Sequence, residues 1–199
     1  MAELTIRESL TKALKEALDN NDNVFLMGED IGMYGGPYAV TKGLLEEYGS
    51  EKIMDTPISE SGFVGAAIGA SMAGMKPIVE IMTINFSLLA IDQIVNHAAK
   101  IYYMSDGQLS VPIIVRTVTG AGGRLGATHS QSFEGWYASV PGLKVVCPSN
   151  AVDALGLFRA AINDNNPVIF VEHSMLYNVK NEVPDQYYET PIGLPKILE

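Results

Sequence analysis

The sequence predicts an α/β fold: a parallel β-sheet with helices on both of its faces. Short, almost entirely apolar segments alternate with longer segments in which apolar residues recur at helical spacing. Strands without an alternating polar face are typical of parallel sheets, which helices cover on both sides. With 199 residues, of which 47% are hydrophobic and 18% charged, the chain is long enough to bury one large core.

The first helix is predicted between Thr5 and Asn20. Apolar residues recur there at intervals of three and four, which is the period of an amphipathic helix. Thr5 is followed by Glu8 three residues later, the spacing of a capping box. A helix therefore begins at Thr5 before the first strand.

The remaining elements alternate strand and helix along the chain. The predicted strands are apolar runs that end at Gly-, Asp- or Pro-containing turns, and they cover residues 24–27, 77–82, 111–117, 143–147 and 167–172. The predicted helices cover residues 41–48, 60–74, 86–104, 133–139 and 151–163. This order favours a doubly wound sheet.

The alternation stops after Glu172, where prolines interrupt a polar segment. We therefore expect one domain in residues 1–175. Residues 176–199 are expected to form an extended tail or linker toward a C-terminal domain that is absent from this chain.

Composition excludes several function classes. A net charge of −10, with Lys and Arg spread thinly, argues against nucleic-acid binding, which needs a basic surface. No uncharged apolar segment of roughly 18 residues and no signal sequence is present, so we expect a soluble protein without a membrane partner. The single Cys147, expected to be a small buried residue, cannot form an intramolecular disulfide and favours a reducing compartment, either a bacterial cytoplasm or an organelle interior.

Familiar catalytic motifs are missing from the sequence. It contains no phosphate-binding loop, no dinucleotide fingerprint and no nucleophile elbow, and its three histidines are too scattered to predict zinc. Any catalytic activity must therefore depend on residues outside these motifs.

Glu60 is the one charged residue between Thr56 and Met75, at the head of a helix rich in Gly and Ala. A carboxyl in apolar surroundings loses hydration, which favours its neutral form and suits proton transfer near neutral pH. Alternatively, an acid at a helix start only complements the helix dipole. Small residues recur on one stripe of this helix and predict close packing against a second backbone: Gly62, Ala66, Gly69 and Ala73.

Two further polar features remain open. His129 lies in the loop after a glycine-rich segment, where the sites of open α/β sheets are usually built. The helix predicted at 86–104 carries a narrow polar stripe that favours a hydrogen-bonded protein interface, with a solvated face as the alternative: Asp92, Gln93, Asn96, His97 and Lys100.

Taken together, segments along nearly the whole chain resemble the beta subunit of the decarboxylating component of 2-oxoacid dehydrogenase complexes, most closely the pyruvate dehydrogenase type. The matching segments are residues 28–30, 57–60, 82–87, 90–96, 129–131, 141–146 and 164–167. Glu60 followed by Gly65, Gly69 and Ala73 also resembles the pyrimidine-domain motif of thiamine diphosphate enzymes, with Ala73 in place of the last glycine.

The resemblance implies a catalytic site around thiamine diphosphate. Glu60 would hydrogen-bond the aminopyrimidine ring of the cofactor and favour its imino tautomer, so that the cofactor can attack a 2-oxoacid and hold the carbanion left by loss of CO2. Glu29 would lie near the same ring, and Phe86 would stack against it. His129 would assist acyl transfer to a lipoyl group.

The resemblance also implies a structural potassium ion. Its expected ligands are backbone carbonyls of Ile113, Ala161 and Ile162, together with Asp164 and Asn166. Oxygen ligands suit such a hard cation.

A missing motif implies a partner subunit. The Gly-Asp-Gly motif that helps to hold magnesium and the diphosphate in this superfamily is not present. The resemblance therefore implies activity only with an alpha subunit that binds Mg²⁺ and the diphosphate, in a two-alpha, two-beta heterotetramer. The lipoyl acyltransferase core of the complex would accept the acyl group.

The sequence leaves alternatives to a pyruvate dehydrogenase. Residues 102–105 and 111–112 look more like the pyruvate and acetoin types than the branched-chain 2-oxoacid type, but all three remain open. A non-catalytic interaction domain of the same fold is the alternative from another class, and the presence of Glu60 argues against it.

Overall fold

The computed structural model describes residues 1–194, and a six-stranded parallel sheet forms its centre. Its strands lie in the order β3-β2-β4-β5-β7-β6. Their bounds are β2 (Val24–Gly28), β3 (Ile53–Asp55), β4 (Lys76–Ile81), β5 (Ile114–Thr119), β6 (Lys144–Val146) and β7 (Val168–His173).

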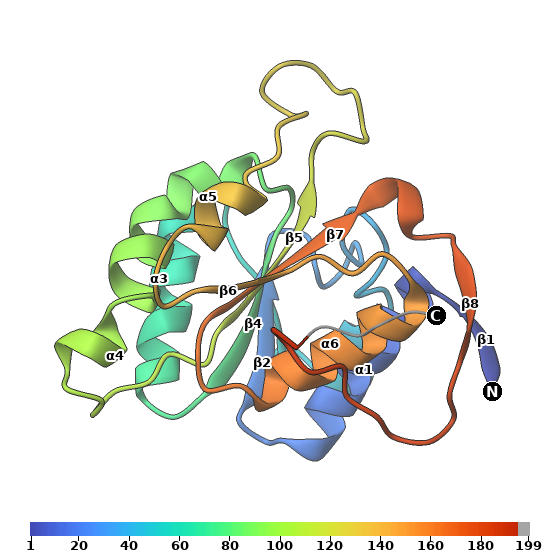
Figure 1. Ribbon diagram of the computed structural model, residues 1–199, viewed down its shortest axis with the longest axis horizontal. Helices are drawn as coiled ribbons and strands as arrows, with labels where there is room; N and C mark the ends of the chain where they lie inside the picture. The colour runs from blue at the N-terminus through green and yellow to red at the C-terminus, as the bar shows by residue number, and fades with distance from the viewer. Residues whose placement is uncertain (195–199) are drawn as a thin grey trace.

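Helices cover both faces of this sheet (Figure 1). On one face, α1 (Ile6–Asn20) and α6 (Ala151–Asn163) pack against each other, and α2 (Leu44–Tyr48) joins their apolar core. On the other face lie α3 (Glu60–Met72), the 3₁₀-helix η1 (Phe86–Ala90) and α5 (Glu134–Ala138). Successive strand residues point into opposite cores, so the predicted α/β class with two covered faces is confirmed.

Local sequence signals start the two long helices of the first face. In α1, the Thr5 hydroxyl accepts a hydrogen bond from the Glu8 amide at 3.1 Å, and the Glu8 carboxylate accepts one from the Thr5 amide at 2.8 Å. In α6, Asn150 Oδ1 accepts from the Asp153 amide at 2.8 Å. Such caps satisfy amides that lack a partner within the helix and contribute about 1 kcal/mol each. The predicted capping box is confirmed.

The single helix predicted at 86–104 is wrong. It is divided into η1, a π-helical segment η2 (Gln93–Ala98) and a short α4 (Ile101–Met104). At the division the Ala99 amide bonds the Ile94 carbonyl, five residues back, and the Lys100 amide bonds the His97 carbonyl, three residues back. The Lys100 side-chain ammonium donates to the Pro141 carbonyl at 2.8 Å. Tertiary contacts thus override the local helical period. Asp92, Asn96 and His97 of the predicted polar stripe are exposed in this chain.

Two smaller differences concern element ends. The helix predicted from residue 41 begins at Leu44, because Gly43 has a φ of 82°, in the left-handed region. Cys147 is exposed beside the edge strand β6, so its predicted burial is wrong.

Within residues 1–194, the stripe of small residues on α3 does not pack against another backbone. Gly62, Ala66, Gly69 and Ala73 are all exposed, whereas the opposite side of α3 is buried through Phe63, Val64, Ala67 and Ile68.

The segment after β7 contains structure that the sequence did not predict. After a short 3₁₀-turn, η3 (Ser174–Leu176), strand β8 (Lys180–Val183) pairs antiparallel with β1 (Ala2–Thr5), which joins the two ends of the described chain. The expected domain boundary at residue 175 stays a prediction.

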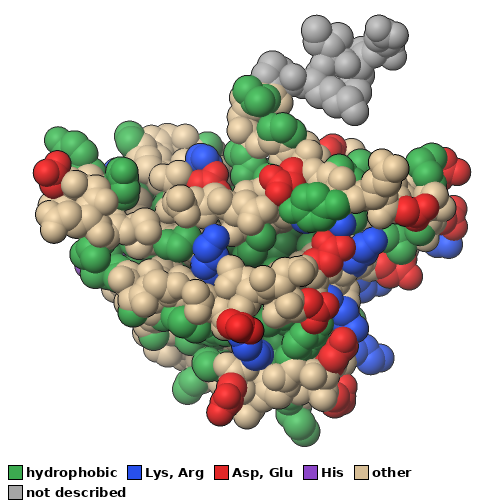
Figure 2. All heavy atoms as spheres, turned by 90° about the horizontal axis from the view of Figure 1, so that it is seen from below, with side chains coloured by type: hydrophobic (Ala, Val, Ile, Leu, Met, Phe, Trp, Pro, Cys, Tyr) green, Lys and Arg blue, Asp and Glu red, His purple; other side chains and the backbone are tan. Residues whose placement is uncertain are grey.

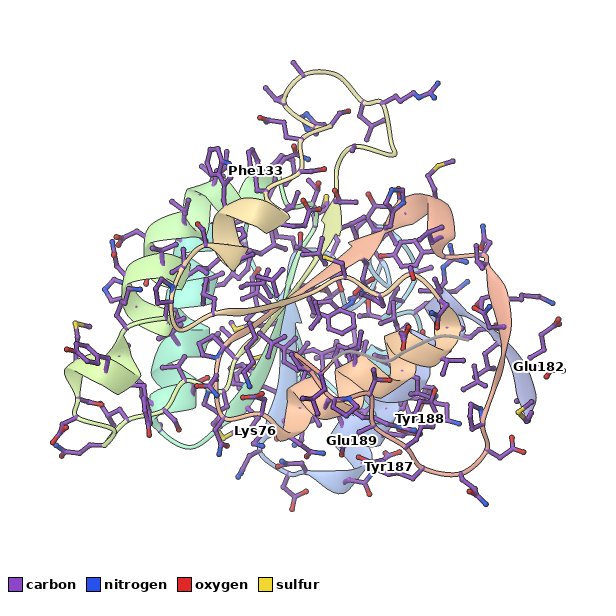
Figure 3. All side chains as sticks on the ribbon, viewed as in Figure 1. Lys76, Phe133, Glu182, Tyr187, Tyr188 and Glu189 are labelled. Atoms are coloured by element: carbon purple, nitrogen blue, oxygen red, sulfur yellow. The ribbon has the colours of Figure 1, made fainter. Side chains whose placement is uncertain are left out.

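The segment that follows β8 lies along α6, as the labelled Tyr187, Tyr188 and Glu189 in Figure 3 show. The guanidinium of Arg159 on α6 lies 4.6 Å from the ring centroid of Tyr187 and 5.0 Å from that of Tyr188. Arg159 also donates two hydrogen bonds to Glu16 on α1, at 2.7 and 2.9 Å. One buried arginine therefore holds this segment and two helices together; we call this set of contacts the arginine clamp.

The described surface carries charges of both signs and has Lys and Arg spread thinly, as the composition indicated. Lys and Arg side chains are interspersed among Asp and Glu on the face seen in Figure 2. Within residues 1–194, none of the helices is long and apolar enough to cross a membrane.

Candidate active site

The residues expected at the site follow four neighbouring strands at the carboxyl edge of the sheet. Glu60 begins α3 after β3, Glu29 follows β2, Phe86 begins η1 after β4, and His129 lies in the loop after β5, which projects above the sheet (Figure 1). The chain crosses to opposite sides of β2 to form β3 and β4. In open α/β sheets, ligands bind outside the carboxyl ends of the strands at such a switch in direction.

Glu29 and Glu60 are both buried, with 6% and 4% of their surface exposed. Burial raises the pKa of Glu29 to about 7, with further contributions from the charges of Glu60 and Asp30. Within the described residues, Oε1 of Glu29 is buried and has no hydrogen-bond partner. Near neutral pH this carboxyl can therefore both hold and release a proton.

The pairing of β2 with β3 sets the positions of the two glutamates. Gly28 pairs with Asp55, and the Thr56 amide donates to the Gly28 carbonyl at 2.9 Å, which extends the ladder to the end of both strands. The Asp55 carboxylate then accepts from the Gly32 amide at 2.7 Å and holds the turn after Glu29. Backbone hydrogen bonds thus bring one acid from each strand to the same edge.

Phe86 and His129 form the second pair of the predicted site. Their ring centroids are 5.2 Å apart and the rings meet edge to face at 88°. The Thr128 hydroxyl and His129 Nδ1 share a 2.9 Å hydrogen bond, so Nε2 is the ring nitrogen left to meet a substrate. Both rings line a cavity of about 300 Å³, whose other lining residues include Tyr38, Thr83, Thr119, Leu125 and Ser174.

The structure therefore brings the four predicted residues to one edge in two pairs. The cavity is lined by Phe86 and His129 but by neither Glu29 nor Glu60. The two glutamates are buried, whereas His129 is exposed.

A buried charge cluster, which the sequence reasoning missed, lies below this edge on the face of α1 and α6. Arg116 on β5 pairs with Glu80 on β4 and with Glu172 on β7, and only 2% of the arginine is exposed. The Tyr177 hydroxyl donates to Glu172 at 2.5 Å. Burial raises the pKa of Glu80, an effect that Arg116 opposes. A single charged residue inside each of three apolar strands was the signal for this cluster.

The five expected potassium ligands lie at the opposite, amino edge of the sheet, between the end of α6 and the start of β7 and just before β5. The Ile113 carbonyl accepts from the Val168 amide at 2.9 Å, and the Ala161 carbonyl accepts from the Asp164 amide at 3.2 Å. This group is therefore separate from the pairs described above.

Two lysines reach the same group of oxygens. Lys76 Nζ donates to the Ile162 carbonyl at 2.9 Å, and Lys144 pairs with the Asp164 carboxylate. Burial acts to raise the pKa of Asp164, but hydrogen bonds from Lys144 and Asn166 outweigh it and hold that pKa below its ordinary value. The oxygen donors suit a hard cation, and the Lys76 ammonium already contacts one of them.

Comparisons with known proteins indicate the family to which this chain is related. Residues 2–180 match the family model described as transketolase, pyrimidine binding domain. The chain is 51% identical over 199 residues to the mitochondrial pyruvate dehydrogenase E1 component subunit beta-1 of Arabidopsis thaliana, covering 98% of this chain and 55% of that protein. It is 51% identical over 198 residues to the pyruvate dehydrogenase E1 component subunit beta of Rhizobium meliloti (strain 1021), covering 99% of this chain and 43% of that protein.

Solved structures share the fold at lower identity. A split-gene transketolase described as an inactive beta4 tetramer superposes with a TM-score of 0.72 at 20% identity, covering 94% of this chain and 56% of that one. The transketolase of Campylobacter jejuni superposes with a TM-score of 0.72 at 18% identity, covering 90% and 27%.

The chain spans about half the length of the curated relatives that it matches. The predicted resemblance to pyruvate dehydrogenase beta subunits and the predicted pyrimidine-domain fold are confirmed. This chain belongs to the transketolase pyrimidine-binding domain family.

Proposed function

We propose that this chain is the pyrimidine-binding part of the beta subunit of a thiamine diphosphate-dependent pyruvate dehydrogenase. The observation that carries the proposal is the buried pair Glu29 and Glu60 at the switch point of the sheet. Identity of about half of all residues to pyruvate dehydrogenase beta subunits supports it. Those relatives are bacterial and mitochondrial, which fits a bacterial cytoplasm or an organelle interior.

The residues present fit the pyrimidine half of the cofactor. A buried carboxylate oxygen without a partner, Oε1 of Glu29, is the kind of atom that a ring donor would satisfy. Glu60 would hold a ring nitrogen through a hydrogen bond, and Phe86 would offer an aromatic face. When bound, thiamine diphosphate supplies the electron sink for decarboxylation of a 2-oxoacid.

The chain's own residues would position the reacting groups and transfer protons. Glu29, with a pKa raised to about 7, exists in both protonation states near neutral pH and can pass a proton within the buried pair. His129 presents Nε2 at the open side of the site, where it would assist acyl transfer to a lipoyl group.

The diphosphate half of the site is assigned to a partner. The proposal includes an alpha subunit that holds Mg²⁺ and the diphosphate, in an assembly of two alpha and two beta subunits. The lipoyl acyltransferase core would receive the acyl group. The name of the Arabidopsis relative as one subunit of an E1 component supports a partner subunit.

Potassium at the amino edge is the remaining part of the proposal. Carbonyls of Ile113, Ala161 and Ile162, with Asp164 and Asn166, would hold it in a structural role away from the chemistry. The Lys76 ammonium shares the Ile162 carbonyl and would weaken the ion's hold there.

Changing Glu60 to Gln tests the proposed function. In the full-length subunit assembled with an alpha subunit, we expect Glu60→Gln to abolish thiamine-dependent turnover and to leave folding and association intact. Glu46→Gln is the matched control, because Glu46 also lies in the first turn of a helix but is exposed. Unchanged turnover in Glu60→Gln would favour the non-catalytic interaction domain.

Substrate choice needs a second measurement. The same assembly should decarboxylate pyruvate faster than branched 2-oxoacids, and acetoin cleavage should be slower than both decarboxylations. The opposite order would assign the chain to the acetoin or branched-chain type.

A further inference from the structure

Asn85 is a buried side chain that joins the two loops carrying Phe86 and His129. It follows β4, precedes Phe86 directly and is 5% exposed. Its Oδ1 accepts a hydrogen bond from the Gln131 amide at 2.9 Å, two residues after His129. Its Nδ2 donates to the Thr83 hydroxyl at 2.7 Å, and that hydroxyl lies 3.3 Å from the Val118 carbonyl of β5.

The backbone at Gly120 packs directly against the Asn85 side chain. The Gly120 amide donates to the Gln131 carbonyl at 3.1 Å, so both backbone groups of Gln131 are held. A Cβ on Gly120 would lie 2.4 Å from Nδ2 of Asn85 and 2.9 Å from the His129 carbonyl. Gly120 therefore lets the loop close directly onto the asparagine amide.

This contact needs both ends of an amide. One end must accept from a backbone N–H and the other must donate to a hydroxyl, which neither Asp nor Ala can do together. Because the group is buried, loss of either partner leaves a polar atom without hydration.

We propose that Asn85 is a positioning residue that fixes the His129 ring edge-on against Phe86 and so presents His129 to the acyl group at the open side of the site. The proposal rests on the proposed function for the role of His129. The geometric part, that Asn85 sets the ring position, is independent of any activity.

A spectroscopic test addresses the geometric part. The chain has three histidines, His97, His129 and His173, so ¹³C-labelled imidazoles give a small set of signals. The Phe86 ring shifts the His129 signal, and Phe86→Leu defines its position without that effect. We expect Asn85→Ala to move the His129 signal to its Phe86→Leu position and to leave the His97 signal unchanged. An unmoved His129 signal overturns the proposal.

A second variant and a control cover a failure to fold. If Asn85→Ala also moves the His97 signal, Thr83→Val decides, because it keeps Asn85 itself and removes the hydroxyl that accepts from the amide, together with that hydroxyl's bond to Val118; movement of the His129 signal alone supports the proposal, and an unmoved signal overturns it. Asn96→Ala is the control, since Asn96 is exposed and bonds Asp92 on its own segment.

A double-mutant cycle tests the consequence for the reaction. In the full-length assembly, we expect Asn85→Ala to slow acyl transfer to a lipoyl domain by about 10- to 100-fold, the cost of a small misplacement of a reacting group. Decarboxylation measured with an artificial oxidant should change by less than about threefold.

Non-additivity is the decisive result of that cycle. Asn85→Ala should slow the His129→Ala enzyme by less than about twofold, since the ring it positions is gone. If the rate losses of the two single variants multiply in the double variant, the positioning role is overturned. If His129→Ala leaves acyl transfer unchanged, the assigned role of His129 fails, and the His129 signal still decides whether Asn85 sets the ring.

Discussion

Removing the charge of Glu29 should stabilise the protein at high pH and leave it unchanged at low pH. Burial and the nearby Glu60 raise the pKa of Glu29 to about 7 from its ordinary value of 4.5. The folded protein therefore holds this proton more tightly than the unfolded chain, and stability falls as the pH rises from 4.5 to about 7. Each pKa unit is about 1.4 kcal/mol, so the full loss is about 3 kcal/mol.

The variant Glu29→Gln keeps the shape of the side chain and cannot ionise. We expect its free energy of unfolding to equal that of the parent near pH 4 and to exceed it by about 3 kcal/mol at pH 8. For a chain of this length that corresponds to roughly 6–12 °C in Tm. Urea unfolding followed by circular dichroism at several pH values gives the difference directly.

The comparison variant is Glu46→Gln, which changes an exposed glutamate and should alter the free energy of unfolding by less than about 0.5 kcal/mol. A Glu29→Gln difference that is the same at pH 4 and pH 8 would refute the reasoning. It would mean that Glu29 titrates alike in the folded and unfolded states.

Three further predictions concern stability and ions. Arg116→Met leaves two buried carboxylates without their cation and should lower the free energy of unfolding by about 3–5 kcal/mol in urea titrations at pH 7; a loss below about 1 kcal/mol contradicts the role of the cluster. Arg159→Ala opens the arginine clamp and should make residues 184–194 the first site of limited proteolysis, while equal cleavage rates in parent and variant would show that the clamp does not hold the segment. Lys76→Met frees the Ile162 carbonyl and should increase the gain in Tm that KCl gives over NaCl, and an unchanged difference would speak against potassium at that edge.

The sequence predicted the elements whose causes are local. The first helix follows from its apolar period and from Thr5 with Glu8, and each long strand follows from an unbroken apolar run. In contrast, β3 and β8 are short, and their stability comes from pairing with strands elsewhere in the chain. The division of the helix after Phe86 likewise lies where a distant segment packs against it, with Gly142 close to the Ala99 carbonyl and the Pro141 carbonyl bonded by the Lys100 ammonium.

Some residues of the candidate site could be predicted from the sequence, and others could not. Glu60 could be singled out as the one acid in an apolar helix, because charged side chains are rarely buried unless they are paired. Glu29 sits in a polar turn that looks like any loop, so only the family resemblance indicated it. Asn85 lies in a segment that carries the family resemblance, but the sequence did not indicate its contact, since that contact joins it to Gln131, 46 residues away.

The pairing of β2 with the three-residue edge strand β3 has a consequence for dynamics. Edge strands open more readily than central ones, and amide hydrogen exchange reports such local opening. Opening of β3 would separate Glu60 from Glu29 and would disturb the two apolar cores only where Ile53 and Met54 pack against them. A ligand that joins the two acids should therefore slow exchange at the amides of residues 53–56 more than at those of β5. A three-residue edge strand would then act as the reporter of an occupied site.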